Sequence, residues 1–271
     1  MARAHYQPSL SLVTGASSGI GAAFARALAA RGSDLVLVAR REDRLRALAS
    51  ELEAAHGIRC TVIALDLSKP KPGAALLREL GSRLPDLVVN NAGFGIQGEV
   101  VATDPDRLAQ EVAVDVAAVV DLCRTFVEPM IARGSGVVLN IASTAAYQPV
   151  PGMAVYAASK AFVKLFTEAL WHEARPHGVT VFAVAPGAVA SEFFAEGKRI
   201  SAPTAYWEPS RIADAGLRAL DRGLGRGSHG GIRVPPEVMP GLANRAAAFS
   251  TRFIPRRVLL HFSSKLAAGQ G

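Results

Sequence analysis

Residues 10–21 read L-S-L-V-T-G-A-S-S-G-I-G, and this stretch decides the fold. A short apolar run, typical of a buried strand, enters a glycine-rich turn, and an alanine-rich helix follows to about Ala30. The glycines permit a tight turn and let backbone N–H groups approach a pyrophosphate at the positive end of the helix. The spacing G-x-x-x-G-x-G differs from the commoner G-x-G-x-x-G, and a glycine turn without a ligand is the alternative. We favour the nucleotide site, because the turn joins the first strand to the first helix.

Beyond this turn, short apolar runs alternate with helical segments along the chain. Strands are expected at 10–14, 34–39, 60–65, 87–90, 137–141 and 180–185, and further helices at 42–55, 104–128 and 155–175. The runs are continuously apolar, as in parallel sheets that are buried on both faces. This alternation predicts an α/β fold with a doubly wound, Rossmann-like parallel sheet, one domain of about seven strands with helices on both faces.

The regular pattern loosens after Pro186. Residues 191–209 hold four aromatic side chains without clear periodicity; a helix is expected at about 210–221 and a short final strand near 232–234. The loose segment lies beyond the sixth strand, where open α/β sheets bind ligands. We interpret it as a mobile substrate lid, and an ordinary surface loop is the alternative.

Composition and charge narrow the class of protein. The 271 residues carry a formal net charge of +7, but the basic residues form no stripe interleaved with aromatic ones, which disfavours nucleic-acid binding. No apolar run reaches the length of a membrane span, and the first residues lack the apolar core of a signal peptide. The two cysteines make no disulfide framework, and neither they nor the histidines show metal-ligand spacing. We therefore expect no metal and a cytoplasmic location.

The end of the second strand bears on the choice of cofactor. An NAD site places an acidic residue there, on the ribose 2′-OH, whereas this chain reads Val38-Ala39-Arg40-Arg41. Arg40 is placed to hold a 2′-phosphate through charge-assisted hydrogen bonds, which favours NADP(H) over NAD. The alternative is a solvated helix start that pairs with acidic neighbours at 42 and 43.

A pair of residues further along suggests proton transfer. Tyr156 and Lys160 are four residues apart, about one helical turn, so the phenol and the ammonium share a face. A phenol with a pKa of about 10 is a poor acid or base near neutral pH, and a fixed positive charge lowers that pKa. Such pairs are frequent on solvated helices, so their weight depends on the other motifs of the chain.

Together these motifs resemble the short-chain dehydrogenase/reductase family from residue 10 to about residue 234. The matches are T-G-x-x-x-G-x-G at 14–21, the acidic residue after the third strand, N-N-A-G at 90–93, a serine at 143, Y-x-x-x-K at 156–160 and P-G at 186–187. The resemblance implies a cofactor held by Gly15, Ser17, Ser18, Gly19, Ile20, Gly21, Arg40, Asp66, Asn91, Ala92, Gly93, Tyr156, Lys160, Pro186, Gly187, Val189 and Ser191.

The resemblance also assigns catalytic roles. Tyr156 is expected to act as general acid in reduction and base in oxidation, with Lys160 lowering its pKa and Ser143 donating to the substrate oxygen. Asp115 replaces the asparagine that the family usually carries in the long helix. Its charge would stabilise the Lys160 ammonium but oppose phenolate formation on Tyr156. The alternative, to which we give equal weight, is that this chain does not need the asparagine.

The remaining expectations concern substrate and partners. Apolar residues near the expected reaction centre predict a hydrophobic or medium-sized carbonyl or alcohol, contacted by Phe94, Gln148, Val150 and Phe193, with Tyr147 and Phe194 nearby. The family forms subunit interfaces through the helices expected at 104–128 and 155–175, so a homodimer or homotetramer is expected. The basic amphipathic segment 242–271 follows the 1–241 domain; we favour its packing on the domain or a partner subunit over an anionic membrane surface.

These inferences lead to two functional hypotheses. The first is an NADP(H)-dependent oxidoreductase that interconverts a carbonyl and an alcohol on a small-molecule substrate. The second is a dinucleotide-binding regulatory or sensor protein with little turnover, suggested by Asp115. The intact residues 143, 156 and 160 favour the first, because a binding protein needs no aligned phenol and ammonium.

Overall fold

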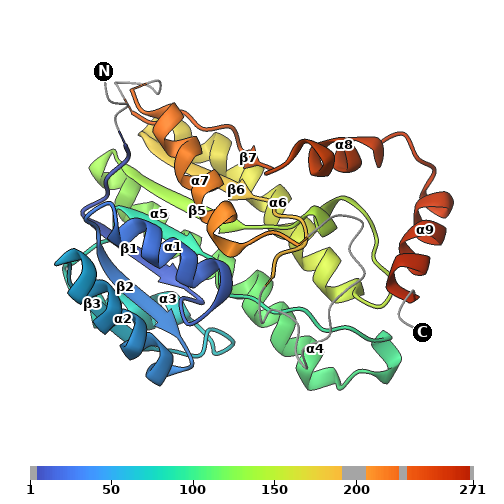
Figure 1. Cartoon of the computed structure of the whole chain (residues 1–271), viewed down its shortest axis with the longest axis horizontal. Helices are drawn as coiled ribbons and strands as arrows, with labels where there is room; N and C mark the ends of the chain where they lie inside the picture. Colours follow the sequence, from blue (N-terminus) through green and yellow to red (C-terminus); the bar gives the residue numbers. More distant parts are fainter. Residues whose placement is uncertain (1–4, 191–205, 226–230, 269–271) are drawn as a thin grey trace.

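The computed structural model contains a seven-stranded, wholly parallel sheet in the order β3-β2-β1-β4-β5-β6-β7 (Figure 1). It describes residues 5–190, 206–225 and 231–268. The order reverses between β1 and β4, and such a reversal creates a ligand-binding crevice at the carboxyl ends of the strands. The strands are β1 (Leu10–Thr14), β2 (Asp34–Ala39), β3 (Cys60–Ala64), β4 (Leu87–Asn90), β5 (Gly136–Ile141), β6 (Val179–Val184) and β7 (Glu237–Val238).

Helices cover both faces of this sheet. The described α-helices are α1 (Gly19–Ala29), α2 (Glu42–His56), α3 (Pro72–Leu80), α4 (Pro105–Val112), α5 (Ala118–Arg133), α6 (Ala154–Ala174), α7 (Pro209–Gly223), α8 (Leu242–Ser250) and α9 (Arg256–Ala268). The side chains of α1, α2 and α7 form one core with alternate strand residues such as Val13, and those of α3, α5 and α6 form the other with residues such as Leu12. Both residues are fully buried, as the continuous apolar runs predict.

One element was not expected from the sequence, and one expectation is wrong. Helix α3, between β3 and β4, was not expected; it begins with a proline in its first turn and buries Leu76 and Leu80, four residues apart. The final strand was expected at 232–234 but lies at Glu237–Val238. In the expected stretch, the carbonyls of Ile232 and Val234 accept side-chain hydrogen bonds from Thr180 and Trp171, so they do not join the ladder of β6.

The helix expected at 104–128 is longer and irregular. Helices α4 and α5 continue through a π turn, η2 (Ala113–Ala117), and α5 ends at Arg133, followed by Gly134 in the left-handed conformation. Asp115 is the central residue of that π turn. Single π turns inside α-helices are frequent at functional sites, because they redirect one side chain relative to the regular spiral.

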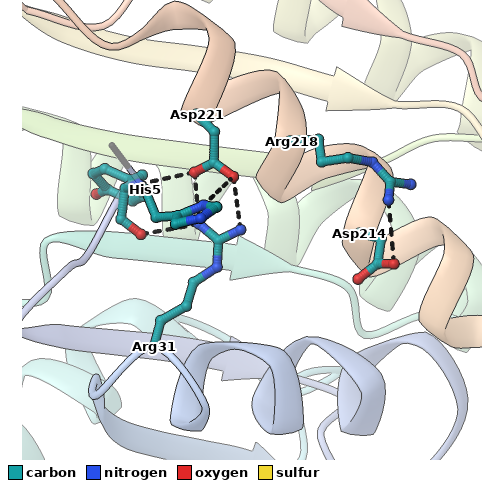
Figure 2. Close-up of polar contacts among 6 residues, drawn as sticks. His5, Arg31, Asp214, Arg218 and Asp221 are labelled. Carbon is teal, nitrogen blue, oxygen red and sulfur yellow. Dashed lines mark hydrogen bonds and ion pairs between the residues drawn. The ribbon is translucent and has the colours of Figure 1, made fainter. Parts of the chain in front are cut away.

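A polar cluster ties the amino-terminal segment to the domain. The Asp221 carboxylate of α7 accepts two hydrogen bonds from Arg31, at 2.7 and 2.9 Å, and one from the backbone of Tyr6 at 2.8 Å. Figure 2 shows Asp221 facing Arg31 and His5, whose ring lies 3.2 Å away. Burial acts to raise the pKa of Asp221, but these hydrogen bonds outweigh it, so the pKa is lowered. The cluster joins α1 to α7 at the amino ends of the strands.

The carboxyl-terminal helices lie beyond β7, at the end of the molecule opposite β3 (Figure 1). Helix α8 contacts η3 (Thr144–Tyr147), the turn that follows β5, and buries Ala248. Its Asn244 packs so closely against Gly187 that a Cβ there would lie 2.8 Å from Nδ2. Among the described helices, none combines the length and apolarity needed to cross a membrane.

Candidate active site

The glycine turn between β1 and α1 has a conformation that requires its glycines. Gly15 and Gly19 adopt φ values of +67° and +55°. A Cβ on Gly21 would lie 2.3 Å from the carbonyl oxygen of Gly15, and one on Gly15 would lie 2.7 Å from Nδ2 of Asn91. The turn therefore packs directly against the start of α1 and against Asn91, and only glycine fits at these positions.

The N-N-A-G segment after β4 is fastened to the same turn. Thr14 Oγ1 accepts hydrogen bonds from the backbone N–H groups of Asn91 and Ala92, at 2.9 and 3.0 Å. The Asn91 side chain in turn donates to the carbonyl of Thr14 at 2.9 Å. These bonds hold the carboxyl ends of β1 and β4 together, at the point where the strand order reverses.

A cavity of about 280 Å³ opens beside these two segments. It brings together most of the residues expected to hold the cofactor, and it also contains Arg41 and the expected substrate residue Phe94. The expected residues along it are Gly15, Ser17, Ser18, Gly19, Ile20, Arg40, Asp66, Asn91, Ala92 and Gly93. Gly21 lies beneath the turn, where it allows the helix to approach.

Two arginines line the end of this cavity. Arg41 donates to the hydroxyls of Ser17 and Ser18, at 3.0 and 2.8 Å. Burial acts to raise the pKa of Asp66, but hydrogen bonds from Ser68 and the charge of Arg40 outweigh it and keep the pKa low. Only Arg40 was expected at this position; the available signal for Arg41 was its place next to Arg40 and the two serines of the glycine turn.

Ser143, Tyr156 and Lys160 meet at the carboxyl end of β5. Ser143 follows that strand, is 8% exposed and is hydrogen-bonded to Tyr156 of α6. The ammonium of Lys160, one turn further along α6, lies 5.7 Å from the centroid of the Tyr156 ring. It also donates to the carbonyl of Ile141 at 3.3 Å. The structure therefore gathers the three residues that the sequence singled out.

Asp115 lies directly behind the lysine. Its Oδ2 is 2.9 Å from Nζ of Lys160, and its Oδ1 accepts the backbone N–H of Phe94 at 3.1 Å. Both side chains are buried, at 0% and 4% exposure. A Cβ on Gly93 would lie 2.9 Å from Oδ1, so a side chain there would displace the carboxylate. Asp115 thus joins the lysine to the segment that lines the cavity.

The pKa of Tyr156 reflects opposing influences. Burial is the largest and raises it, Lys160 and the hydrogen bond with Ser143 lower it, and Asp115 raises it again, so the net direction is upward. Burial lowers the pKa of Lys160, but the charges of Asp115 and Tyr156 more than compensate and raise it, so the ammonium is retained. Asp115 therefore stabilises the lysine and opposes phenolate formation, in the direction inferred from the sequence.

Glu111 is a residue of this region that the sequence analysis did not single out. It lies in the last turn of α4, four residues before Asp115, and is 0% exposed. Burial and the charge of Asp115 raise its pKa to about 7, although the Ile96 backbone and the charges of Lys160 and Arg107 act to lower it. The available signal was its four-residue spacing from Asp115 in a helix.

The segment after β6 lies at the carboxyl end of the sheet, next to the residues that follow β5. The carbonyl of Pro186 accepts the Thr144 N–H at 2.9 Å, which ties it to the residue after Ser143. Val189 forms a parallel bridge with Trp207. Ser191, Phe193 and Phe194, together with the lid expected at 191–209 up to residue 205, lie outside the described residues.

The expected substrate residues are partly exposed around the turn after β5. Tyr147 donates a hydrogen bond to Glu237 of β7, and Gln148 and Val150 follow it. Phe94 lines the same cavity as the glycine turn, with the Arg107 guanidinium 5.2 Å from its ring centroid. Within 5–190, 206–225 and 231–268, no group of three or more His, Cys, Asp or Glu residues is arranged to hold a metal ion.

The sequence profile of the family described as short chain dehydrogenase matches residues 10–199. The chain belongs to this family. The expected family and the expected doubly wound fold are therefore confirmed.

Solved structures of the short-chain dehydrogenase family superimpose on most of the chain. A short-chain dehydrogenase from Sphingobium yanoikuyae, in complex with NADPH, is 32% identical with a TM-score of 0.78, covering 90% of this chain and 93% of that one. The bulky-bulky ketone specific alcohol dehydrogenase from Comamonas testosteroni is 29% identical with a TM-score of 0.76, covering 92% and 93%.

Curated relatives in this family include longer proteins. The very-long-chain 3-oxoacyl-CoA reductase of Mus musculus is 33% identical over 191 residues, which are 67% of this chain and 59% of that protein. The probable oxidoreductase EphD of Mycobacterium bovis is 33% identical over 190 residues, 69% of this chain and 32% of that protein. This chain therefore spans about a third of EphD and less than two thirds of the mouse reductase.

Proposed function

We propose that the protein is an NADP(H)-dependent oxidoreductase that interconverts a carbonyl and an alcohol, with Tyr156 as general acid and base. The observation that carries this proposal is the hydrogen bond between Ser143 and Tyr156, with the Lys160 ammonium 5.7 Å from the phenol ring. The oxidoreductase class rests on family membership. The cofactor, the chemistry and the substrate are inferred from the site.

The cavity fits a dinucleotide. The glycine turn at 15–21 lines the cavity at the start of α1, where backbone N–H groups and the positive end of the helix would bind a pyrophosphate. Arg40 and Arg41 line the cavity, and they would hold a 2′-phosphate through charge-assisted hydrogen bonds. This arrangement supports NADP(H) over NAD, as does the NADPH in the Sphingobium structure. Asp66 would contact the adenine, and Pro186, Gly187, Val189 and Ser191 the nicotinamide end.

The bound dinucleotide supplies or accepts the hydride. During reduction, the Tyr156 hydroxyl donates its proton to the substrate oxygen, and during oxidation the phenolate removes it. Ser143 donates a hydrogen bond to the same oxygen as negative charge develops there. Lys160 stabilises the phenolate through its charge, and Asp115 holds the lysine in place.

The substrate is proposed to be a hydrophobic or medium-sized carbonyl or alcohol, contacted by Phe94, Gln148, Val150 and Phe193. Family members that act on a bulky ketone or a very-long-chain 3-oxoacyl-CoA support this class. In a spectrophotometric assay, NADPH absorbance should fall with at least one class of ketone or aldehyde. Tyr156→Phe should abolish that turnover while keeping dinucleotide binding, and equal turnover by the variant would contradict the role of the phenol.

The alternative function, a dinucleotide-binding sensor with little turnover, is favoured by the upward pKa of Tyr156 and by the charge of Asp115. A sensor would bind NADPH, with no turnover on any carbonyl class in the panel. The same assay, combined with a fluorescence titration of NADPH, distinguishes the two functions.

Two surfaces bear on the oligomeric state and on the position of the 242–271 segment. Phe162 and Leu165 of α6 are 40% and 63% exposed, which supports a homodimer or homotetramer through this helix. The contacts of α8 with η3 and Gly187 support packing of the 242–271 segment on its own 1–241 domain. Sedimentation with anionic vesicles at low and high salt tests the alternative, a membrane surface, which requires salt-sensitive binding.

A further inference from the structure

The last turn of α4 carries a buried carboxyl group to which the proposed mechanism gives no role. Glu111 is 0% exposed, and apart from the backbone of Ile96 no described group donates a hydrogen bond to its carboxyl oxygens. Burying an ionised carboxylate without a partner is so costly that such a group usually takes up a proton instead. The protonation state of Glu111 therefore needs a physical explanation.

The surroundings of Glu111 belong to the reaction centre. Helix α4 and the π turn pack against α6, which carries Tyr156 and Lys160. The charged groups that act on Glu111 are Asp115 in the π turn, Lys160 on α6 and Arg107 on its own helix. Glu111 in turn acts on Tyr156, where its charge raises the pKa of the phenol.

Glu111, Asp115 and Lys160 form a buried cluster of two carboxyl groups and one ammonium. Asp115 has the ammonium of Lys160 at 2.9 Å and the N–H of Phe94 at 3.1 Å, whereas Glu111 has neither contact. Two neighbouring carboxylates do not both ionise readily, and the one with a cation against it keeps the charge. Burial raises the pKa of both carboxyl groups, but Lys160 and the Phe94 N–H act against this rise at Asp115, so we assign the extra proton to Glu111, whose pKa rises to about 7.

We propose that Glu111 is a positioning residue that sets the charge of the reaction centre. With its proton, Glu111 leaves the cluster with one negative charge, on Asp115, and one positive charge, on Lys160. When the proton leaves for solvent, a second negative charge opposes phenolate formation on Tyr156. This inference rests on the proposed oxidoreductase function, because it concerns the acid and base strength of that phenol.

Glu111→Gln provides a test with a specific pH signature. Glutamine resembles the protonated glutamic acid, so the variant and the wild type should match below about pH 6 and diverge above about pH 8, on either side of the Glu111 titration. A unit charge about 10 Å away at an effective dielectric constant of about 20 changes an ionisation constant roughly tenfold, and this is the expected increase in phenolate fraction. Glu111→Asp should retain the titration.

Two readouts keep this test separate from the proposed function. The ionisation of Tyr156 is followed by ultraviolet difference spectroscopy, with Tyr156→Phe as the reference, and alcohol oxidation is measured over the same pH range. The matched control is Glu79→Gln, an exposed glutamate of α3. Absence of turnover by the wild type would contradict the proposed function, while the spectra would still decide the role of Glu111.

The outcomes are distinct. Phenolate spectra of Glu111→Gln that coincide with the wild type would overturn the proposal. A ratio of variant to wild-type oxidation rates that is the same at every pH would also overturn it, since a constant ratio indicates packing alone. If Glu111→Gln does not fold, infrared spectroscopy of the wild type and Glu111→Asp replaces it. A protonated-carboxyl band that disappears near neutral pH, and shifts in Glu111→Asp, supports the proposal; its absence refutes it.

Discussion

Replacing Asp115 by asparagine should make Tyr156 a stronger acid. Asp115 lies 2.9 Å from Lys160 Nζ, which lies 5.7 Å from the Tyr156 ring centroid, so the carboxylate oxygen is at most about 8.6 Å from that centroid. At this distance and an effective dielectric constant of about 20, a unit charge contributes about 2 kcal/mol, or about 1.4 pKa units. Asparagine removes that charge with little change in shape, so the pKa of Tyr156 should fall by about one unit.

The assay is the pH dependence of kcat/KM for alcohol oxidation, which requires the phenolate. The ascending, acid-side limb of the profile, which reports the pKa of Tyr156, should shift about one unit toward lower pH in Asp115→Asn. Lys160→Met should shift it the other way by about two units, because the ammonium acts over only 5.7 Å. Asp214→Asn, an exposed change on α7, is the control and should leave the limb in place. An unmoved limb in Asp115→Asn, or one shifted upward, would refute the electrostatic reasoning.

Three further predictions concern the cofactor and the fold. Replacing Arg40 and Arg41 together by alanine should raise KM for NADPH roughly 10- to 100-fold, since charged hydrogen bonds contribute about 1.5–3 kcal/mol, and should leave KM for NADH unchanged in parallel assays. Gly21→Ala places a Cβ 2.3 Å from a backbone oxygen and should weaken NADPH binding at least about fivefold in a fluorescence titration, since overpacking costs about 1–3 kcal/mol. Asp221→Ala, which leaves Arg31 unpaired, should lower the unfolding free energy by about 2–4 kcal/mol in urea titrations at neutral pH. Because the folded pKa of Asp221 is lowered, its contribution is present above pH 4 or thereabouts and is lost as pH falls through the folded pKa, so the difference should shrink in acid.

The sheet could be predicted from the sequence because each buried strand is a short apolar run. The first six strands lie at or within one residue of the expected positions. The last strand was predicted at the wrong place because Ile232 and Val234 are β-branched residues typical of a strand. Only tertiary hydrogen bonds from Thr180 and Trp171 reveal that their carbonyls are in use. Apolar character alone does not specify which backbone groups pair.

The site was predictable where the motif fixes local geometry, and less so where it depends on packing between helices. The glycine turn, Ser143, Tyr156 and Lys160 belong to such motifs. The burial of Glu111 depends on how α4 and the π turn pack against α6, and a helical pattern does not reveal the extra residue of a π turn. Which of two adjacent arginines reaches the turn serines is likewise decided by the backbone at the start of α2.

The Asp221 cluster has a consequence for how this domain can be joined to others. It fastens residues 5 and 6 at the amino ends of the strands, whereas the dinucleotide cavity opens at their carboxyl ends. A fluorescent protein or a second enzyme fused ahead of residue 5 would therefore attach on the side away from the cofactor entrance. Fusions at this end should leave access to the cavity intact, whereas fusions after α9 would extend from the carboxyl-terminal segment, whose helix α8 packs against Gly187 and η3.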